Sequence, residues 1–156
     1  MTWDGRRTPA RYRYAATGPQ DTGLGSGTWV TIGGYSVPFP GFSSETIEGT
    51  SGVVVTHVNG VITANVNCWI DVAFYGEIDN DATGRRGARI MMDGVGTDSV
   101  NSANIQAAVT ATPMRLSARY VGPLAAGHTL TVQAFQDSGS SLNLTWRQIV
   151  IDATAL

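Results

Sequence analysis

The stretch GVITANVNCWIDVAFYGEI at residues 60–78 decides the fold class. From residue 68 onward, large apolar side chains recur with a period of two, and that period is typical of a β-strand with one buried face. We therefore expect one face of this strand in the core and the other at a subunit interface or on a partly wet surface. The expected core face holds Ile70, Val72, Phe74 and Ile78, and the second face holds Trp69, Asp71, Ala73, Tyr75 and Glu77.

The segments around this strand also predict β-structure. Residues 52–58 and 61–66 are β-branched runs separated by Asn59-Gly60, which is a strong signal for a two-residue hairpin turn. Pro38 and Pro40 restrict residues 35–42 to the edge of a sheet. No segment has convincing helical periodicity, so the chain is predicted to be an all-β sandwich. The remaining expected strands lie within 28–32, 85–94, 105–113, 114–124, 125–139, 140–146 and 147–156.

The composition indicates one domain whose surface is extensively covered. A chain of 156 residues is long enough for one real core. Only 14% of the residues are charged, which is low for a soluble domain and favours burial against sister subunits or a larger assembly. All the basic residues are Arg, a bias that we attribute to the codon usage of a GC-rich genome.

The N-terminal residues 1–27 differ from the rest of the chain. Their first 20 residues hold four Arg and one Asp, whereas the remainder of the chain is acidic. Gly and Pro interrupt any periodicity, so we expect an extended arm and linker, followed by a β-domain at 28–156. A disordered tail is the alternative. Spaced Arg and aromatic side chains suit docking on a partner, and the candidate docking residues are Trp3, Arg6, Arg7, Arg11, Tyr12, Arg13 and Tyr14.

The sequence lacks the patterns of the common catalytic sites. Cys68 is the only cysteine, which excludes an internal disulfide and a CxxC pair. His57 and His128 have no partner at metal-ligand spacing, and no serine-hydrolase or nucleotide-binding motif is present. We expect a non-enzymatic protein without a cofactor. The sequence has no apolar run long enough to span a membrane, and we expect no signal peptide because the N-terminal residues lack an apolar segment.

Two ligand classes remain as weaker hypotheses. Asp79 and Asp81 lie in an oxygen-rich loop that could hold calcium, although the loop lacks the distal Glu of a calcium-binding hand, and Arg85 and Arg86 follow directly. A loop whose acids are solvated or paired with these arginines is the favoured interpretation. We do not expect the basic arm to bind nucleic acid, because the body is acidic and the arm is short.

The order of the segments resembles the complement-type globular head domain, which shares its jelly roll with tumour necrosis factor and is widespread in phage structural proteins. The hairpin and long strand at 60–78 resemble that domain's hairpin arm and central strand. RRGARIMMDG resembles its strand ending in an Asn-Gly or Asp-Gly turn, PLAAGHTLTVQAFQDSG its segment opened by a leucine-containing turn, and LNLTWRQIVIDATAL its closing strand. The resemblance covers residues 28–156. It departs at His128, where the family usually has Asp, and at Cys68-Trp69, which replaces a typical Gly-Tyr.

The resemblance implies a compact homotrimer with large apolar faces around a three-fold axis. Candidates for the trimer interface or the core are Trp29, Trp69, Tyr75, Tyr120, Phe135 and Trp146. In phages such domains are virion structural proteins, so we expect a head decoration protein on the capsid or a minor tail protein for host attachment. The arm would bind another capsid or tail protein, and the loops could meet a host cell-surface glycan. We expect synthesis in the host cytoplasm and a final place on the virion surface. A carbohydrate-binding, lectin-like module is the alternative.

Overall fold

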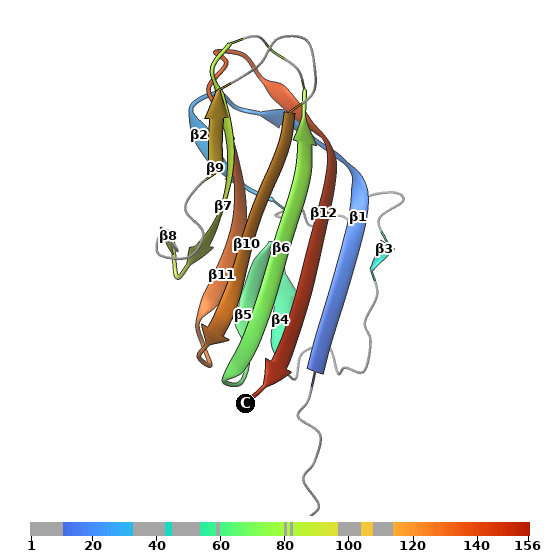
Figure 1. The fold of residues 1–156 in the computed structure, drawn as a ribbon, viewed down its shortest axis with the longest axis vertical. Helices are drawn as coiled ribbons and strands as arrows, with labels where there is room; N and C mark the ends of the chain where they lie inside the picture. The colour runs from blue at the N-terminus through green and yellow to red at the C-terminus, as the bar shows by residue number, and fades with distance from the viewer. Residues whose placement is uncertain are drawn as a thin grey trace, which may run out of the picture.

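The computed structural model describes residues 11–32, 43–44, 54–58, 60–79, 81, 83–96, 104–107 and 114–156. Two antiparallel sheets pack face to face in these residues, as Figure 1 shows. None of the described segments is a helix that could cross a membrane. The strands are β1 (Arg11–Leu24), β2 (Thr28–Thr31), β3 (Ser43–Ser44), β4 (Val55–Val58), β5 (Val61–Ala64), β6 (Cys68–Ile78), β7 (Arg85–Met92), β8 (Val95–Gly96), β9 (Asn104–Ala107), β10 (Met114–Leu124), β11 (Thr129–Gln136) and β12 (Leu142–Ala155).

The strand order is that of a jelly roll. The first sheet has the order β10-β6-β12-β1-β3. The second sheet has the order β4-β5-β11-β7-β8, with β2 also paired to β11 and β9 also paired to β7. Pairing is nested along the chain, because β1 pairs with β12, β5 with β11, β6 with β10 and β7 with β9. A long hairpin folded over in this way gives the two sheets of a jelly-roll sandwich, so the predicted fold class is confirmed.

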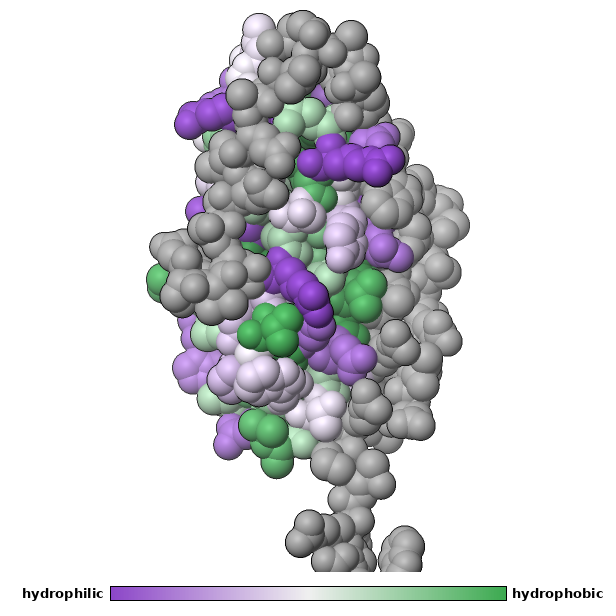
Figure 2. Space-filling view, in the orientation of Figure 1, coloured by the Kyte–Doolittle hydropathy of each residue, from purple (hydrophilic) through white to green (hydrophobic). Residues whose placement is uncertain are grey.

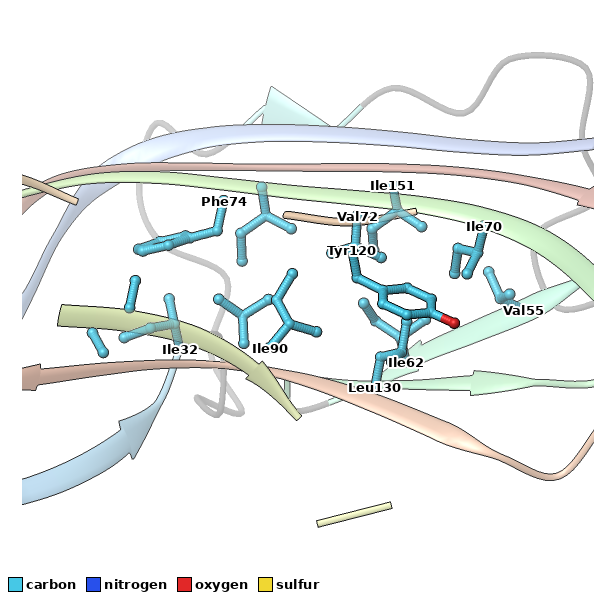
Figure 3. Close-up of a cluster of buried hydrophobic side chains, with 14 of the residues drawn as sticks. Ile32, Val55, Ile62, Ile70, Val72, Phe74, Ile90, Tyr120, Leu130 and Ile151 are labelled. Carbon is cyan, nitrogen blue, oxygen red and sulfur yellow. The ribbon is translucent and has the colours of Figure 1, made fainter. Parts of the chain in front are cut away.

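The core lies between the two sheets and follows from the period-two pattern. On β6 the four predicted core residues are fully buried, and Ile62, Ile90 and Leu130 of the second sheet face them (Figure 3). Tyr120 enters the same cluster from β10, and its hydroxyl donates to the carbonyl of Pro123 at 2.8 Å. Each buried aliphatic or aromatic side chain of this kind contributes about 1.5–3 kcal/mol to stability.

Two turns explain how neighbouring strands reverse. The predicted hairpin joins β4 and β5 with Val58 paired to Val61, and Gly60 has a φ of 76° in that turn. Asp93 and Gly94 have φ values of 50° and 76° between β7 and β8. Two successive residues with positive φ form the turn type that matches the twist of a hairpin, and Asp93-Gly94 forms such a turn. The predicted hairpin between β4 and β5 is confirmed by the pairing of Val58 with Val61.

The arm predicted at residues 1–27 is wrong for its second half. Residues 11–24 form β1, which pairs along its whole length with β12, from Arg11 opposite Thr154 to Leu24 opposite Leu142. The β-domain therefore includes these residues instead of beginning at 28. Tyr12, a predicted docking residue, is a core residue with 4% exposure. Trp3, Arg6 and Arg7 lie outside the described residues, as does the predicted edge segment at 35–42.

The C-terminal segments also differ from their predicted division. Residues 140–146 and 147–156 were expected to be two strands, but Leu142–Ala155 is one strand, with an irregularity in register between Leu144 and Trp146. Strand β12 lies between β6 and β1 and pairs with both, so backbone pairing on both sides maintains the strand through the irregularity.

We predict that Gly76→Ala destabilises the domain, whereas Gly25→Ala does not. A Cβ at Gly76 would lie 2.8 Å from the Phe74 ring and 3.0 Å from Leu144, inside the packed core, but a Cβ at Gly25 would meet nothing within 4 Å. Overpacking of this kind costs about 1–3 kcal/mol. Urea titration of both variants measures the free energy of unfolding, and equal stabilities would contradict this account of the packing at Gly76.

Candidate functional site

The outward face of the first sheet carries exposed aromatic side chains. Trp69 and Tyr75 project from β6, an interior strand of this sheet, with 50% and 46% of their surface exposed. Val121 of the neighbouring strand β10 is 36% exposed, and Pro123 is the register partner of Trp69. Figure 2 shows that hydrophobic and hydrophilic side chains are interspersed on this side of the molecule. We call the outward residues of β10, β6 and β12 the aromatic face.

A bidentate ion pair lies in the middle of the aromatic face. Arg119 donates from Nε to Asp71 Oδ1 at 2.9 Å and from Nη2 to Asp71 Oδ2 at 2.6 Å. The hydrogen bonds and the charge of Asp71 raise the pKa of Arg119. The next strand places Asp152 opposite Asp71, and β1 places Arg13 opposite Asp152. A row of charged residues therefore crosses the sheet between its apolar positions.

A second cluster lies on the outward side of the second sheet, where Trp29 of β2 is the register partner of Phe135 of β11. Their ring centroids are 5.1 Å apart, and the planes are tilted by 31°. Arg89 of β7 reaches across β11, and its guanidinium lies 4.0 Å from the centroid of the Trp29 ring. Gln133 accepts a hydrogen bond from Arg89 Nε at 2.8 Å and donates to Thr31 at 3.5 Å. We call these five residues the tryptophan–arginine cluster.

In the loop between β6 and β7, the carboxylates of Asp79 and Asp81 accept hydrogen bonds from other residues of the same chain. Asp81 Oδ1 accepts hydrogen bonds from the backbone N–H and the hydroxyl of Thr83, at 2.9 and 2.7 Å. These bonds, the side-chain one first, lower the pKa of Asp81. Asp79 Oδ2 accepts from the backbone N–H of Asn143 at 3.1 Å. Among the described residues no three acidic, histidine or cysteine side chains gather as metal ligands, so no observed cluster supports calcium at Asp79 and Asp81.

A buried arginine donates hydrogen bonds to the backbone of the same loop. Arg86 is completely buried, and its guanidinium donates to the carbonyls of Thr83, Arg85 and Asp81 at 2.9, 3.1 and 3.3 Å. Its neighbour Arg85 pairs with Asp137 of the β11–β12 loop, with Nη2 2.7 Å from Oδ2. The backbone N–H of Arg85 also donates to Asp137, and this bond is the main reason that the pKa of Asp137 is lowered. These bonds join the two loops and determine their conformation.

Comparisons with known proteins give structural likenesses only. No known protein family matches the sequence, and no curated protein matches it either. The structure is similar to the Eiger TNF of S. frugiperda, with 12% identity over 96% of this chain and 94% of that chain and a TM-score of 0.45. It is also similar to murine APRIL at pH 8.0, with 12% identity over 90% of this chain and 98% of that chain and a TM-score of 0.46. The jelly-roll assignment rests on the strand order of the chain itself.

The structure separates the six residues predicted for a trimer interface or the core. Trp69 and Tyr75 are on the aromatic face, and Trp29 and Phe135 are in the tryptophan–arginine cluster on the opposite side. Tyr120 is a core residue with 6% exposure, and burial is the main cause of its raised pKa. Trp146 is opposite Glu77 of β6 and Pro19 of β1 in the backbone register. Sequence reasoning missed Arg89 and Arg119 as partners, because only the strand registers bring them to Trp29 and Asp71.

The histidines and the cysteine do not form a catalytic group. His57 is in β4, where burial lowers its pKa, and His128 precedes β11 and contacts Asp93 at 2.5 Å. Cys68 is buried, its thiol donates to the carbonyl of Leu124 at 3.7 Å, and desolvation raises its pKa. A buried thiol with a raised pKa is a poor nucleophile. Cys68 therefore lacks the features of an activated nucleophile.

We predict that Asp137→Asn reduces the dependence of stability on acid pH. The pKa of Asp137 in the folded protein is below its ordinary value of 3.8, so its stabilising effect is present above pH 3.8 and is lost as the pH falls through the folded pKa. Urea titrations at about pH 6 and about pH 2.5 measure this loss. The difference between the two pH values should be smaller in the variant than in the wild type, and an unchanged difference would contradict the assignment.

Proposed function

We propose that this chain is a non-enzymatic structural protein that forms a homotrimer through the aromatic face. The observation that carries the proposal is the exposure of Trp69 and Tyr75 on β6, an interior strand of 11 residues that is paired on both sides. Aromatic residues dominate the binding energy of protein interfaces when they are covered. The low charge content of the chain agrees with a surface that is covered in an assembly.

The ion pair on the aromatic face is compatible with burial between copies. Covering one unpaired carboxylate would be strongly unfavourable, but Asp71 already has two hydrogen bonds from Arg119 of its own chain. A neighbouring copy can therefore cover the aromatic side chains without supplying a partner for Asp71. Charged residues of both signs in one row also favour a single register between copies over random apolar contact.

We further propose that the trimer is a bacteriophage virion structural protein, exposed on the particle as a head decoration protein or a minor tail protein. The resemblance of residues 28–156 to phage jelly-roll proteins and the exclusive use of Arg support this proposal. Residues 1–10, with Trp3, Arg6 and Arg7, precede β1 and would bind another capsid or tail protein. The protein would be made in the host cytoplasm and finish on the virion surface.

We predict that the wild-type protein has about three times the mass of the 16.4 kDa chain in solution and that the double variant Trp69→Ser, Tyr75→Ser is smaller. Both side chains are half exposed in the single chain, so their replacement should spare the fold while removing apolar contact area. Val58→Ser is the matched control, because Val58 is 57% exposed but belongs to the second sheet. Light scattering measures the masses. A trimeric double variant would exclude the aromatic face as the interface, and a monomeric wild type would contradict the proposed homotrimer in free solution.

The location of the protein on particles tests the virion proposal separately. Gold-labelled antibody against the chain should decorate purified phage particles of the strain that encodes it, either on the head or at the tail. The position of the label distinguishes decoration from attachment. Absence of label on intact particles, with the protein recovered only from the soluble lysate, would refute the virion role and leave the trimer unaffected.

A further inference from the structure

We propose that Asp93 is a site of isoaspartate formation that the fold keeps closed, with His128 and Thr129 as the residues that close it. The modification is a covalent rearrangement of the Asp93-Gly94 bond in the turn between β7 and β8. This turn belongs to the second sheet, whereas the aromatic face belongs to the first. The inference therefore goes beyond the structural role proposed above and does not depend on assembly.

The chemistry needs only these two residues and water. The backbone nitrogen of Gly94 attacks Cγ of the neutral Asp93 carboxyl group, the nitrogen loses its proton, and one carboxyl oxygen leaves as water, so that a succinimide ring forms. Water then opens the ring. Attack at Cγ regenerates aspartate, whereas attack at the main-chain carbonyl carbon leaves the backbone running through the side chain, as isoaspartate. One water is released and one is consumed, and nothing is oxidised or reduced.

The sequence and the exposure of the turn favour this reaction. Glycine has no side chain that could shield its backbone nitrogen, and even a Cβ added at Gly94 would meet nothing within 4 Å. Asp93 and Gly94 are both exposed, so water can reach the carbons of the ring. The local sequence alone would therefore make Asp93 a reactive position.

Contacts with the start of β11 hold the Asp93 carboxylate in place. Asp93 Oδ1 accepts hydrogen bonds from the backbone N–H and the hydroxyl of Thr129, at 2.8 and 3.3 Å. Asp93 Oδ2 contacts Nδ1 of His128 at 2.5 Å. The backbone N–H of Asp93 donates to the carbonyl of Thr129 at 3.0 Å, so the main chain and the side chain of Asp93 are bound to the same segment. These side-chain contacts must break before Cγ can turn toward the nitrogen of Gly94.

The same contacts keep the carboxylate in its unreactive form. The hydrogen bond with His128, followed by the backbone hydrogen bond from Thr129, lowers the pKa of Asp93. An ionised carboxylate is a poor electrophile, because it is negatively charged and cannot release its oxygen as water. The pairing of Met92 with Val95 also holds the two ends of the turn together. Isoaspartate would add one backbone atom to this turn, so the modification would disturb the β7–β8 pairing.

Incubation in heavy-oxygen water at neutral pH tests the proposal, because each passage through the succinimide introduces one heavy oxygen atom at residue 93. Mass spectrometry of the peptide that contains Asp93 measures this rate and separates it from reactions at Asp4-Gly5 and Asn59-Gly60. The folded wild type should incorporate the label more slowly than the same chain in concentrated urea by about tenfold or more, since hydrogen bonds to a charged group must break first. Equal rates would overturn the closed site.

Variants at the start of β11 test which residues close the site. The double variant His128→Ala, Thr129→Val should incorporate the label several-fold faster than the folded wild type, whereas Thr129→Ser keeps the hydroxyl and should react like the wild type. Thr131→Val is the matched control, because Thr131 is on the same strand, opposite Met91, and makes none of the contacts with Asp93 described above. Circular dichroism establishes that each variant is folded, and His128→Ala alone replaces the double variant if that variant is unfolded. An unchanged rate in the folded variant, or equal acceleration by Thr131→Val, would overturn the assignment of His128 and Thr129.

Discussion

The backbone pairing of β12 with β6 on one side and with β1 on the other is the constraint on which the rest of the structure depends. Strand β12 is the last strand of the chain, and it joins the first strand to the middle of the sequence. Without it β1 would have no place in the first sheet, and Tyr12 and Leu24 would leave the core that they help to fill. Strands this far apart in the sequence pair only after much of the chain between them has been ordered. The jelly roll is therefore complete only when β1 and β12 have paired.

The same register determines the composition of the two outward faces. Alternation along β6 buries Ile70 and Val72 and thereby forces Trp69 and Asp71 outward. Pairing with β10 brings Arg119 to Asp71, and pairing of β11 with β2 and β7 brings Arg89 over Trp29. One face therefore gains apolar side chains around an internally satisfied ion pair, while the other gains a cation supported by aromatic rings. The two faces therefore differ in chemistry, and only the first is proposed to be covered by a copy.

The sequence predicted those elements whose pattern is local. Strand β6 was predicted with the bounds that the structure has, because apolar and other residues alternate along all of it. The hairpin at Asn59-Gly60 was predicted because its signal is local, a dipeptide between two β-branched segments. Strand β1 was missed because Gly18, Pro19 and Gly23 interrupt its pattern, and only its pairing with a strand more than 100 residues away makes it extended. The partners of Trp29 and Asp71 were missed for the same reason, since a register between distant strands cannot be read from either strand alone. The trimer, the phage particle and the glycan remain predictions.

The meeting of the first and last strands also determines how the domain responds to force. Arg11 and Thr154 are paired neighbours at one end of the antiparallel β1–β12 ladder, the end at which Figure 1 marks the C-terminus. A pull applied between the two termini would load this ladder one residue pair at a time and peel it open, instead of shearing all its hydrogen bonds together. A chain tethered through one terminus alone leaves the ladder unloaded. The domain is therefore mechanically suited to attachment through one terminus. If a larger assembly transmitted force through both termini, the β1–β12 ladder would open at low force.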